Sequence, residues 1–222
     1  MMRPRSEEPR PELGVLPNIL VFCGPSGCGK STLIGHLMSD YPGRFGFSVS
    51  HTTRAPRVGE INGVHYHFVD PSQMEPEDQF LEHAIVHGNH YGTSFEAINS
   101  VILAQKICIL DIDVQGVDAM KKSDRIDQSR VVYVMLIPPS ITELETRLRR
   151  RSTDKEEVIG NRLRRASEEI KWRTKENFWD VVLVNDDIEE CYKKLEDVIV
   201  LFFKINPSSQ LGTLSARKSR TD

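Results

Sequence analysis

One loop near the start of the chain constrains its fold more than any other feature. Residues 24–32 read GPSGCGKST, in which Gly24, Gly29, Lys30 and Ser31 fill the fixed places of the pattern G-x-x-x-x-G-K-[ST]. The apolar run NILVFC precedes the loop, and apolar residues at helical spacing follow it. The sequence therefore predicts a buried strand, a tight glycine-rich loop and a helix, one directly after another.

A loop of this kind is suited to hold an anion. The first turn of a helix offers unpaired N–H groups and the positive end of the helix dipole, and glycines let the backbone come close to the ligand. We expect Lys30 to reach the terminal phosphates of a nucleotide and the Ser31 hydroxyl to ligate Mg²⁺. A plain tight turn with a helix cap is the alternative, and the flanking strand and helix patterns disfavour it.

Apolar runs alternate with helical patterns along the rest of the chain. The runs span residues 18–23, 106–112, 131–137 and 181–184. Strands separated by helices predict an α/β fold in which a parallel sheet is flanked by helices.

Two stretches interrupt this alternation. The first, from about residue 48 to residue 92, begins around the alternating run FGFSVS, continues through VHYHFV and predicts a small β-rich insertion. The second, from Arg147 to Arg173, is dense in Arg and Glu at helical spacing and predicts a charged helical excursion. After the insertion, Thr93 and Glu96 have the spacing of a capping box and predict the start of a helix.

Composition and charge exclude some classes of function. The chain has 29 basic and 32 acidic residues and a net charge of −3, so we do not expect a general nucleic-acid binder. No apolar stretch is long enough to cross a membrane, so we expect a soluble, cytoplasmic protein without a membrane partner and with its cysteines reduced. Residues 1–16 and 207–222 are polar and without period, and we expect them to be disordered tails.

Two aspartates follow the second apolar run. ILDID puts Asp111 at the carboxyl end of a predicted strand, the edge at which open α/β sheets bind ligands, and Asp113 just beyond it. A carboxylate there can hold the water shell of Mg²⁺, so Asp111 is a candidate metal residue together with Ser31. For either aspartate alone, the cap of the following helix remains an alternative.

The insertion carries an arginine pair in SHTTRAPRVGE. Arg54 and Arg57 are three residues apart, Ser50 precedes them and Tyr66 follows nine residues after the second arginine. Two planar guanidinium groups can bind the oxygens of one phosphate bidentately, and a tyrosine hydroxyl can add a donor. A solvated turn with scattered charges is an equally good interpretation of the pair alone.

Histidines are also frequent in this stretch. His83 and His87 are four residues apart, with three further histidines nearby. A metal site is disfavoured, because no carboxylate or cysteine completes a set of ligands at a recognisable spacing.

Taken together, these blocks resemble guanylate kinase, an ATP:GMP phosphotransferase of the P-loop nucleoside monophosphate kinases. The resemblance covers roughly residues 18–203, and the SHTTR block makes it specific. The blocks, in order, are GPSGCGKST, FGFSVSHTTRAPRVGEINGVHY, FLEH, GNHYGTS, ILDIDVQGV, RLRRRSTDKEEVIGNRLRRA and VNDD. The resemblance implies Mg²⁺-dependent transfer of the γ-phosphate of ATP to GMP or dGMP, giving ADP and GDP in purine nucleotide metabolism.

The resemblance also implies roles for individual residues. It assigns the GMP phosphate to Arg54, Arg57, Tyr66 and Tyr91, and guanine to Ser50, Glu82, Thr93 and Asp113. It assigns ATP to Gly24, Gly27, Cys28, Gly29, Lys30, Ser31, Thr32, Arg147, Asn185 and Asp186. The expected catalytic residues are Lys30, Arg57, Arg151 and Arg162. Guanine has an acceptor at O6 and donors at N1 and N2, which a hydroxyl and a carboxylate complement.

The same resemblance divides the chain into parts. A P-loop core would comprise residues 17–47, 93–146 and 180–206, with a GMP-binding insertion at 48–92 and a lid at 147–179 that closes over both nucleotides. The path through residues 170–179 matches the family less clearly, and Cys28 takes a variable position of the loop. We expect a monomer or a weak dimer.

Two other functions compete with this interpretation. A noncatalytic scaffold domain of the same type is disfavoured by the intact Lys30 and Ser31, and a kinase for another phosphate acceptor by Glu82 together with Ser50. No general base lies near the arginine pair in the sequence, but a nucleotide phosphate with a second pKa of about 6 is already largely ionised at neutral pH. The chemistry expected is therefore positioning and charge neutralisation.

Overall fold

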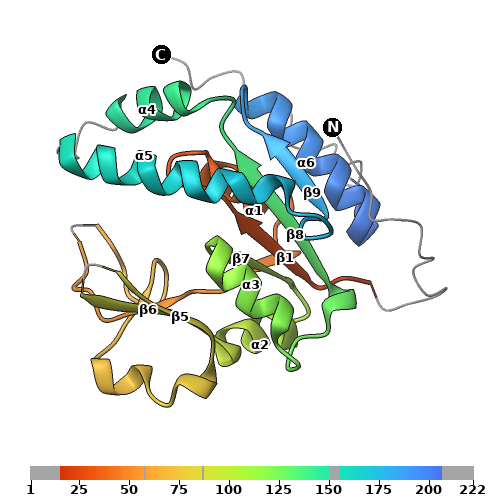
Figure 1. Cartoon of the computed structure of the whole chain (residues 1–222). Helices are drawn as coiled ribbons and strands as arrows, with labels where there is room; N and C mark the ends of the chain where they lie inside the picture. The colour runs from red at the N-terminus through yellow and green to blue at the C-terminus, as the bar shows by residue number, and fades with distance from the viewer. Residues whose placement is uncertain (1–15, 58, 87, 151–155, 207–222) are drawn as a thin grey trace.

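The computed structural model describes residues 16–57, 59–86, 88–150 and 156–206, and its strands form two sheets (Figure 1). The main sheet has five parallel strands in the order β2-β7-β1-β8-β9. These strands are β1 (Ile19–Cys23), β2 (Phe45–Phe47), β7 (Ile107–Asp111), β8 (Val131–Ile137) and β9 (Val181–Val184). The smaller sheet has four strands in the order β4-β3-β6-β5. They are β3 (His51–Thr52), β4 (His67–Phe68), β5 (Phe80–Val86) and β6 (Asn89–Ser94).

Helices flank the main sheet, as the alternation of the sequence predicts. The helices are α1 (Lys30–Asp40), α2 (Phe95–Leu103), α3 (Val114–Lys122), α4 (Ile141–Arg150), α5 (Glu156–Lys171) and α6 (Ile188–Phe203), of which α4 and α5 pack against each other in a separate apolar cluster. Short 3-10 helices lie at Pro71–Met74, Glu77–Gln79, Gln128–Arg130 and Trp172–Thr174. No helix of the described ranges is long and apolar enough to cross a membrane.

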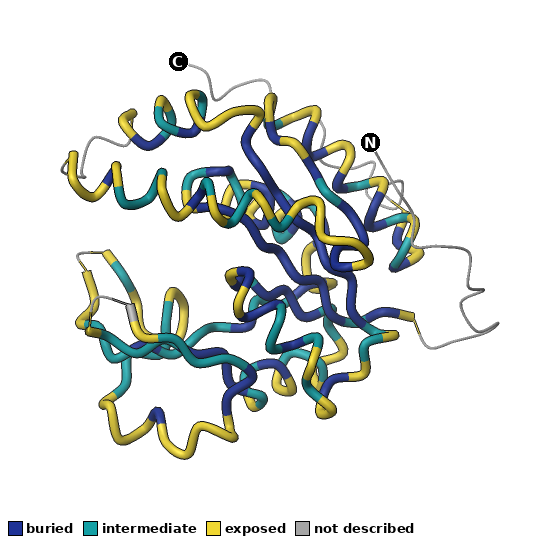
Figure 2. The backbone as a smooth tube through the Cα atoms, in the orientation of Figure 1, coloured by how far each residue is buried: buried dark blue, intermediate teal, exposed yellow. Residues whose placement is uncertain are grey.

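The core lies on both faces of the main sheet. Along β1, Leu20 and Phe22 join the apolar cluster under α1 and α6, whereas Ile19 and Val21 join the cluster under α2 and α3. Successive side chains of a strand point to opposite faces, so a strand covered by helices on both sides is apolar throughout. The strands accordingly form the buried centre of the molecule, with the exposed residues on the outer sides of the helices (Figure 2).

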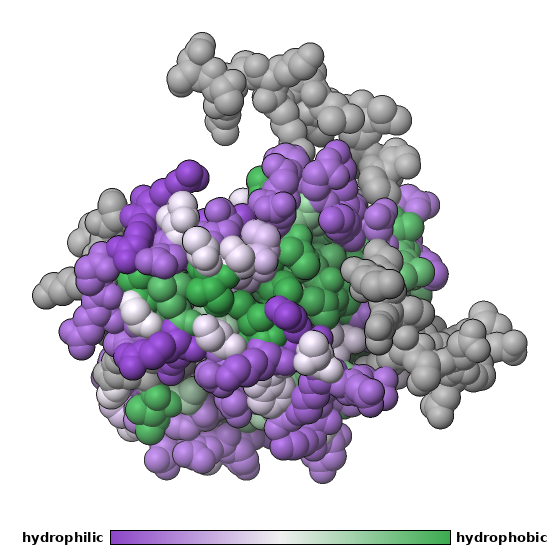
Figure 3. Space-filling model, turned by 45° about the horizontal axis from the view of Figure 1, so that its top comes forward, coloured by the Kyte–Doolittle hydropathy of each residue, from purple (hydrophilic) through white to green (hydrophobic). Residues whose placement is uncertain are grey.

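The outer surface is largely polar. The view with the upper side of the molecule turned forward shows apolar residues gathered in a band across the middle, between rims of polar side chains (Figure 3). The helices α4 and α5 carry much of the charge of the upper side, in agreement with the Arg- and Glu-rich pattern of their sequence.

Two predicted strands differ from those observed. In FGFSVS only Phe45–Phe47 forms a strand, and it pairs with β7 at the edge of the main sheet. Phe45 is 2% exposed and packs into the core under α1, so core packing determines where this run belongs. In VHYHFV only His67–Phe68 is a strand, beside β3.

The smaller sheet stands beside the main sheet, next to α2 and α3 (Figure 1). Its strands β5 and β6 form an antiparallel pair, and β6 also pairs with β3. The helix α3 packs against β5, so the smaller sheet is joined to the carboxyl edge of β7 through the helix that follows β7.

Candidate functional site

The predicted phosphate loop connects β1 to α1 at the carboxyl edge of the main sheet. Gly24 has a φ of 141°, and a Cβ atom there would lie 1.9 Å from the carbonyl oxygen of Leu136 in β8. Glycine is therefore required at this position, both for the backbone angle and for the close approach to β8. The N–H of Cys28 donates to the carbonyl of Pro25 at 3.2 Å and tightens the turn.

Lys30 begins α1 and lies between the loop and the end of β7. Its ammonium donates to the carbonyl of Gly24 and lies 3.6 Å from Oδ1 of Asp111. Burial opposes the charge of Lys30, but the Asp111 carboxylate and neighbouring groups outweigh it, and the pKa of Lys30 is raised. The residue stays charged beside the loop, where an anion would bind. Ser31 and Thr32 follow in the first turn and are exposed.

The two aspartates of ILDID have different surroundings. Asp113 is the N-cap of α3, and its Oδ1 accepts from the N–H groups of Gln115 at 3.0 Å and Gly116 at 2.9 Å. The capping interpretation therefore holds for Asp113. Asp111 is the last residue of β7, as predicted, and its carboxylate faces Lys30, a contact that the sequence did not predict.

Three of the four residues predicted to contact guanine form a hydrogen-bonded row, and the fourth, Asp113, caps α3 instead. The Thr93 hydroxyl donates to Oε1 of Glu82 at 2.7 Å and lies 3.2 Å from the Ser50 hydroxyl. Burial raises the pKa of Glu82, the bond from Thr93 lowers it, and the nearby charge of Asp113 raises it further. The row thus presents a hydroxyl and a partly buried carboxylate side by side.

The same row corrects one prediction about secondary structure. The predicted cap of α2 at Thr93 is wrong, because Ser94 is the N-cap and accepts from the N–H of Ala97 at 3.1 Å. Thr93 is fully buried in β6 and its hydroxyl is engaged by Glu82 instead.

The residues predicted to hold the acceptor phosphate gather around Arg54. Its guanidinium lies 5.5 Å from the ring centre of Tyr66, and the Tyr66 and Tyr91 rings are 6.0 Å apart in an edge-on arrangement. Two nitrogens of Arg54 donate to the two carboxylate oxygens of Glu60 at 2.9 and 3.0 Å. This bidentate pair, together with the bond from the backbone N–H of Arg57, lowers the pKa of Glu60 to about 2. Arg54 is therefore held in place before any ligand binds.

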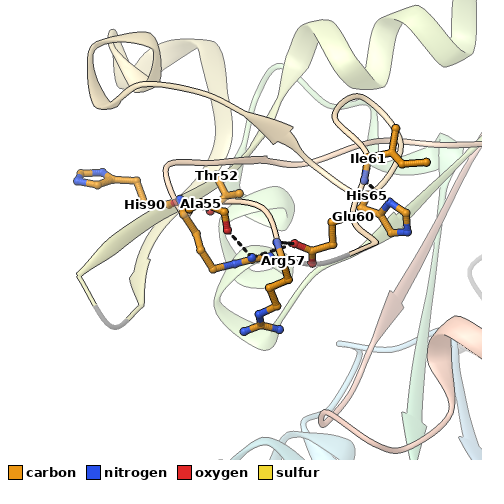
Figure 4. A network of polar contacts seen from close by, with 8 residues as sticks. Thr52, Ala55, Arg57, Glu60, Ile61, His65 and His90 are labelled. Atoms are coloured by element: carbon orange, nitrogen blue, oxygen red, sulfur yellow. Dashed lines mark hydrogen bonds and ion pairs between the residues drawn. The ribbon is translucent and has the colours of Figure 1, made fainter. Parts of the chain in front are cut away.

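Arg57 has a different position from its neighbour. Its backbone N–H donates to the Glu60 carboxylate at 2.7 Å, while its side chain is exposed and extends away from Glu60 (Figure 4). One carboxylate thus fixes the backbone of Arg57 and the guanidinium of Arg54.

Histidines of the smaller sheet pair with one another. Nε2 of His83 and Nδ1 of His90 are 2.8 Å apart, and Nδ1 of His83 lies 3.5 Å from the Glu77 carboxylate. His87, the other member of the candidate metal pair, lies outside the described residues.

Two of the arginines predicted to contact ATP phosphates lie on α4 and α5. Arg147 donates to the backbone carbonyls of Asn185 at 2.9 Å and Asp186 at 3.0 Å. Arg162 of α5 reaches the Ser26 hydroxyl of the phosphate loop at 3.4 Å. Arg151 lies outside the described residues.

A cleft separates the start of α3 from α5. It has a volume of about 640 Å³ and places Asp113 and Gln115 opposite Arg165 and Glu169. Burial raises the pKa of Glu169, and the charge of Lys30 opposes this shift.

Two residues of the site were missed by sequence reasoning. Glu60 could have been found, because an acidic residue follows both arginines within the SHTTRAPRVGE block. Glu169 gave no usable signal, because it is one of many charged residues in a helical pattern.

Comparison with known proteins agrees with this arrangement. The sequence model of the family described as guanylate kinase matches residues 17–201. The chain belongs to the guanylate kinase family. It is 52% identical over 185 residues to guanylate kinase 1 of Oryza sativa, with 82% of this chain and 47% of that protein covered. It is 49% identical to a guanylate kinase of Schizosaccharomyces pombe, with 81% of this chain and 88% of the relative covered.

A solved guanylate kinase structure has the same fold. The protein from Anaplasma phagocytophilum matches with a TM-score of 0.61 and 31% identity, over 85% of this chain and 87% of that one. This similarity confirms the predicted fold class, a parallel sheet flanked by helices. The chain spans about half the length of the Oryza relative and most of the length of the Schizosaccharomyces one.

The ion pair between Arg54 and Glu60 gives a prediction about titration. In Arg54→Gln the bidentate donor is lost, so the Glu60 carboxyl should titrate well above its value of about 2 and toward the ordinary glutamate value of about 4.3. A carbon-detected NMR titration of the Glu60 carboxyl measures this directly.

The exposed Arg164 supplies the control. Arg164→Gln should leave the titration of Glu60 unchanged. If Glu60 titrates at the same pH in Arg54→Gln and in the wild type, Arg54 does not hold that carboxylate.

Proposed function

We propose that the protein transfers the γ-phosphoryl group of ATP to GMP, and more weakly to dGMP, with Mg²⁺ as the cofactor. The observation that carries this proposal is the row of Ser50, Thr93 and Glu82 in a chain with an intact phosphate loop. The loop supports a nucleotide triphosphate as the donor. The row supports guanine as the base of the acceptor.

Base selection follows from donors and acceptors. An ionised Glu82 accepts from N1–H and N2–H of guanine, and the hydroxyl of Ser50 can donate to O6. Adenine offers an unprotonated N1 at the corresponding place, so it would leave the carboxylate facing an acceptor. Thr93 holds the carboxylate of Glu82 in position at 2.7 Å.

The acceptor phosphate is held by charge rather than activated by a base. Arg54, Arg57, Tyr66 and Tyr91 supply donors around it, and Arg54 is already fixed by Glu60. A phosphate oxygen that is ionised at neutral pH needs no proton removed before it attacks. The residues therefore bring two anions into line and neutralise their charge.

The donor end is formed by the phosphate loop and α5. Lys30 would exchange its contact with the Gly24 carbonyl for a phosphate oxygen, and Arg162 would move from Ser26 onto the migrating group as α5 closes. The predicted partner of Arg162 in this step, Arg151, lies outside the described residues.

The residues at the edge of the main sheet fit a magnesium ion. Mg²⁺ prefers oxygen ligands and usually takes one or two from the protein and the rest from water and phosphates. The exposed Ser31 hydroxyl and the Asp111 carboxylate, whose side chain is 31% exposed, would hold it directly or through water. When bound, the ion neutralises charge on the phosphate oxygens during transfer.

A coupled assay with each nucleoside monophosphate in turn tests the proposal. We expect fast ADP formation with GMP, slower formation with dGMP, and little with AMP, CMP or UMP. Chelation of Mg²⁺ should abolish the reaction, and its restoration should return it. Equal turnover with AMP and GMP, or activity that persists after chelation, would contradict the proposal.

A substitution at Glu82 tests base selection. Glu82→Gln keeps the size of the side chain but places an amide against two guanine donors, so kcat/KM for GMP should fall by about 5- to 150-fold, corresponding to about 1–3 kcal/mol. Activity with AMP should fall much less. Initial rates with both nucleotides give the ratio.

The exposed Glu75 provides the matched control in the same part of the chain. Glu75→Gln should leave both rates unchanged. If Glu82→Gln keeps the wild-type preference for GMP over AMP, Glu82 does not choose the base.

A further inference from the structure

Asn185 follows β9 and its side chain lies beneath the phosphate loop. The residue is 3% exposed, and its amide nitrogen Nδ2 donates to the carbonyl oxygen of Cys28 at 2.8 Å. This bond joins residues 157 positions apart, so it connects the last strand of the main sheet to the loop after the first. Its presence could not be inferred from local sequence.

The loop rests directly on this amide. Gly29 has a φ of 103°, and a Cβ atom there would lie 2.3 Å from Nδ2 of Asn185. A side chain at position 29 would collide with the Asn185 amide at that distance. Gly29 of the motif therefore leaves the space that Asn185 occupies.

The backbone of Asn185 is itself held from two sides. Its N–H donates to the carbonyl of Ile137 at 2.8 Å, continuing the pairing of β8 with β9. Its carbonyl accepts from Arg147 at 2.9 Å, and Arg147 is in turn paired with Glu143 at 2.8 Å. The amide that supports the loop is therefore carried by a fixed segment of the main sheet.

The orientation of the Asn185 side-chain amide indicates which of its two polar atoms supports the loop. Oδ1 of Asn185 is buried and has no hydrogen-bond partner within the described part of the chain. A buried acceptor without a partner is unfavourable, so an asparagine here needs a compensating interaction, which is the bond that Nδ2 donates. The reverse orientation would place two acceptors against each other.

Holding the Cys28 carbonyl also orients the next N–H group. In a planar trans peptide the C=O and N–H bonds point in opposite directions, so a carbonyl directed at Asn185 directs the N–H of Gly29 away from it. N–H groups at the start of a helix are the donors that bind phosphate oxygens, and Gly29 is the residue that caps α1.

We propose that Asn185 is a positioning residue that sets the Gly29 amide for phosphate binding, independently of any contact with the adenine base. This inference rests on the proposed function, because the loop is taken to bind the phosphates of ATP. It differs from the expectation of the sequence resemblance, in which Asn185 belongs to the segment near adenine.

A ligand without a base separates the two roles. Inorganic tripolyphosphate with Mg²⁺ offers the phosphates of ATP and nothing else. In Asn185→Ala, calorimetry should show the affinities for Mg²⁺-tripolyphosphate and for an unreactive ATP analogue falling by the same factor, about tenfold for one lost hydrogen bond to the loop. The affinity for GMP should stay at the wild-type value.

Asp180 supplies the control at the other end of the same strand. Its buried carboxylate accepts from the N–H of Tyr133 at 2.9 Å, so Asp180→Ala also removes a buried bond between a side chain and the backbone. That variant should lose thermal stability without losing affinity for tripolyphosphate. Asn185→Asp, which keeps the shape but replaces the donor by an acceptor, should weaken tripolyphosphate binding at least as much as Asn185→Ala.

A second readout follows the loop itself. In the wild type, the amide proton resonance of Gly29 should shift strongly on addition of Mg²⁺-tripolyphosphate, and the shift should be reduced in both Asn185 variants. Unchanged tripolyphosphate affinity with weaker binding of the ATP analogue would overturn the inference in favour of a base contact. Wild-type protein that binds neither compound would instead contradict the proposed function, and this inference with it.

Discussion

The phosphate loop has no room for a side chain where it crosses the end of the main sheet, and the rest of the site depends on this close approach. Because Gly24 packs on the carbonyl of Leu136, α1 begins directly over the carboxyl ends of the strands. Lys30 then reaches both the loop and Asp111, which stands at the end of the neighbouring strand β7. Asn185, which follows β9, donates to the Cys28 carbonyl of the loop. Three strands of one sheet thus fix a loop that consists mostly of backbone.

The two halves of the site use different chemistry. In the proposed reaction the loop would bind phosphates, which are alike in every nucleotide, and main-chain donors with one lysine are sufficient for that purpose. The smaller sheet would bind the base through side chains, because a base is distinguished by the order of its donors and acceptors. Their positions are set in advance by Glu60 for Arg54 and by Thr93 for Glu82. Because these side chains are ordered before binding, less conformational entropy is lost when the ligand binds.

Strands could be predicted from the sequence where burial on both faces of a strand leaves a continuous apolar run. The strands β8 and β9 begin and end at the predicted residues. Prediction failed where an alternating run is a strand over only part of its length, as in FGFSVS, or where two adjacent hydroxyls compete for one role, as with Thr93 and Ser94. In the site, Lys30 and Asp111 lie at the loop and at the end of a strand as predicted, whereas the contact between them was not predicted. The bonds of Arg147 and Asn185 to distant backbone carbonyls could not be predicted, because they depend on how β9 aligns with the loop.

The most direct test of this account measures the reaction and the fold of a Lys30→Met protein together. The substitution removes the ammonium group that lies between the loop and Asp111, and the glycines, the strands and the smaller sheet should keep their packing. The account predicts a thermal unfolding curve close to that of the wild type, unchanged GMP affinity and phosphoryl transfer reduced by about 10²-fold or more. A folded Lys30→Met protein that phosphorylates GMP at the wild-type rate would contradict it.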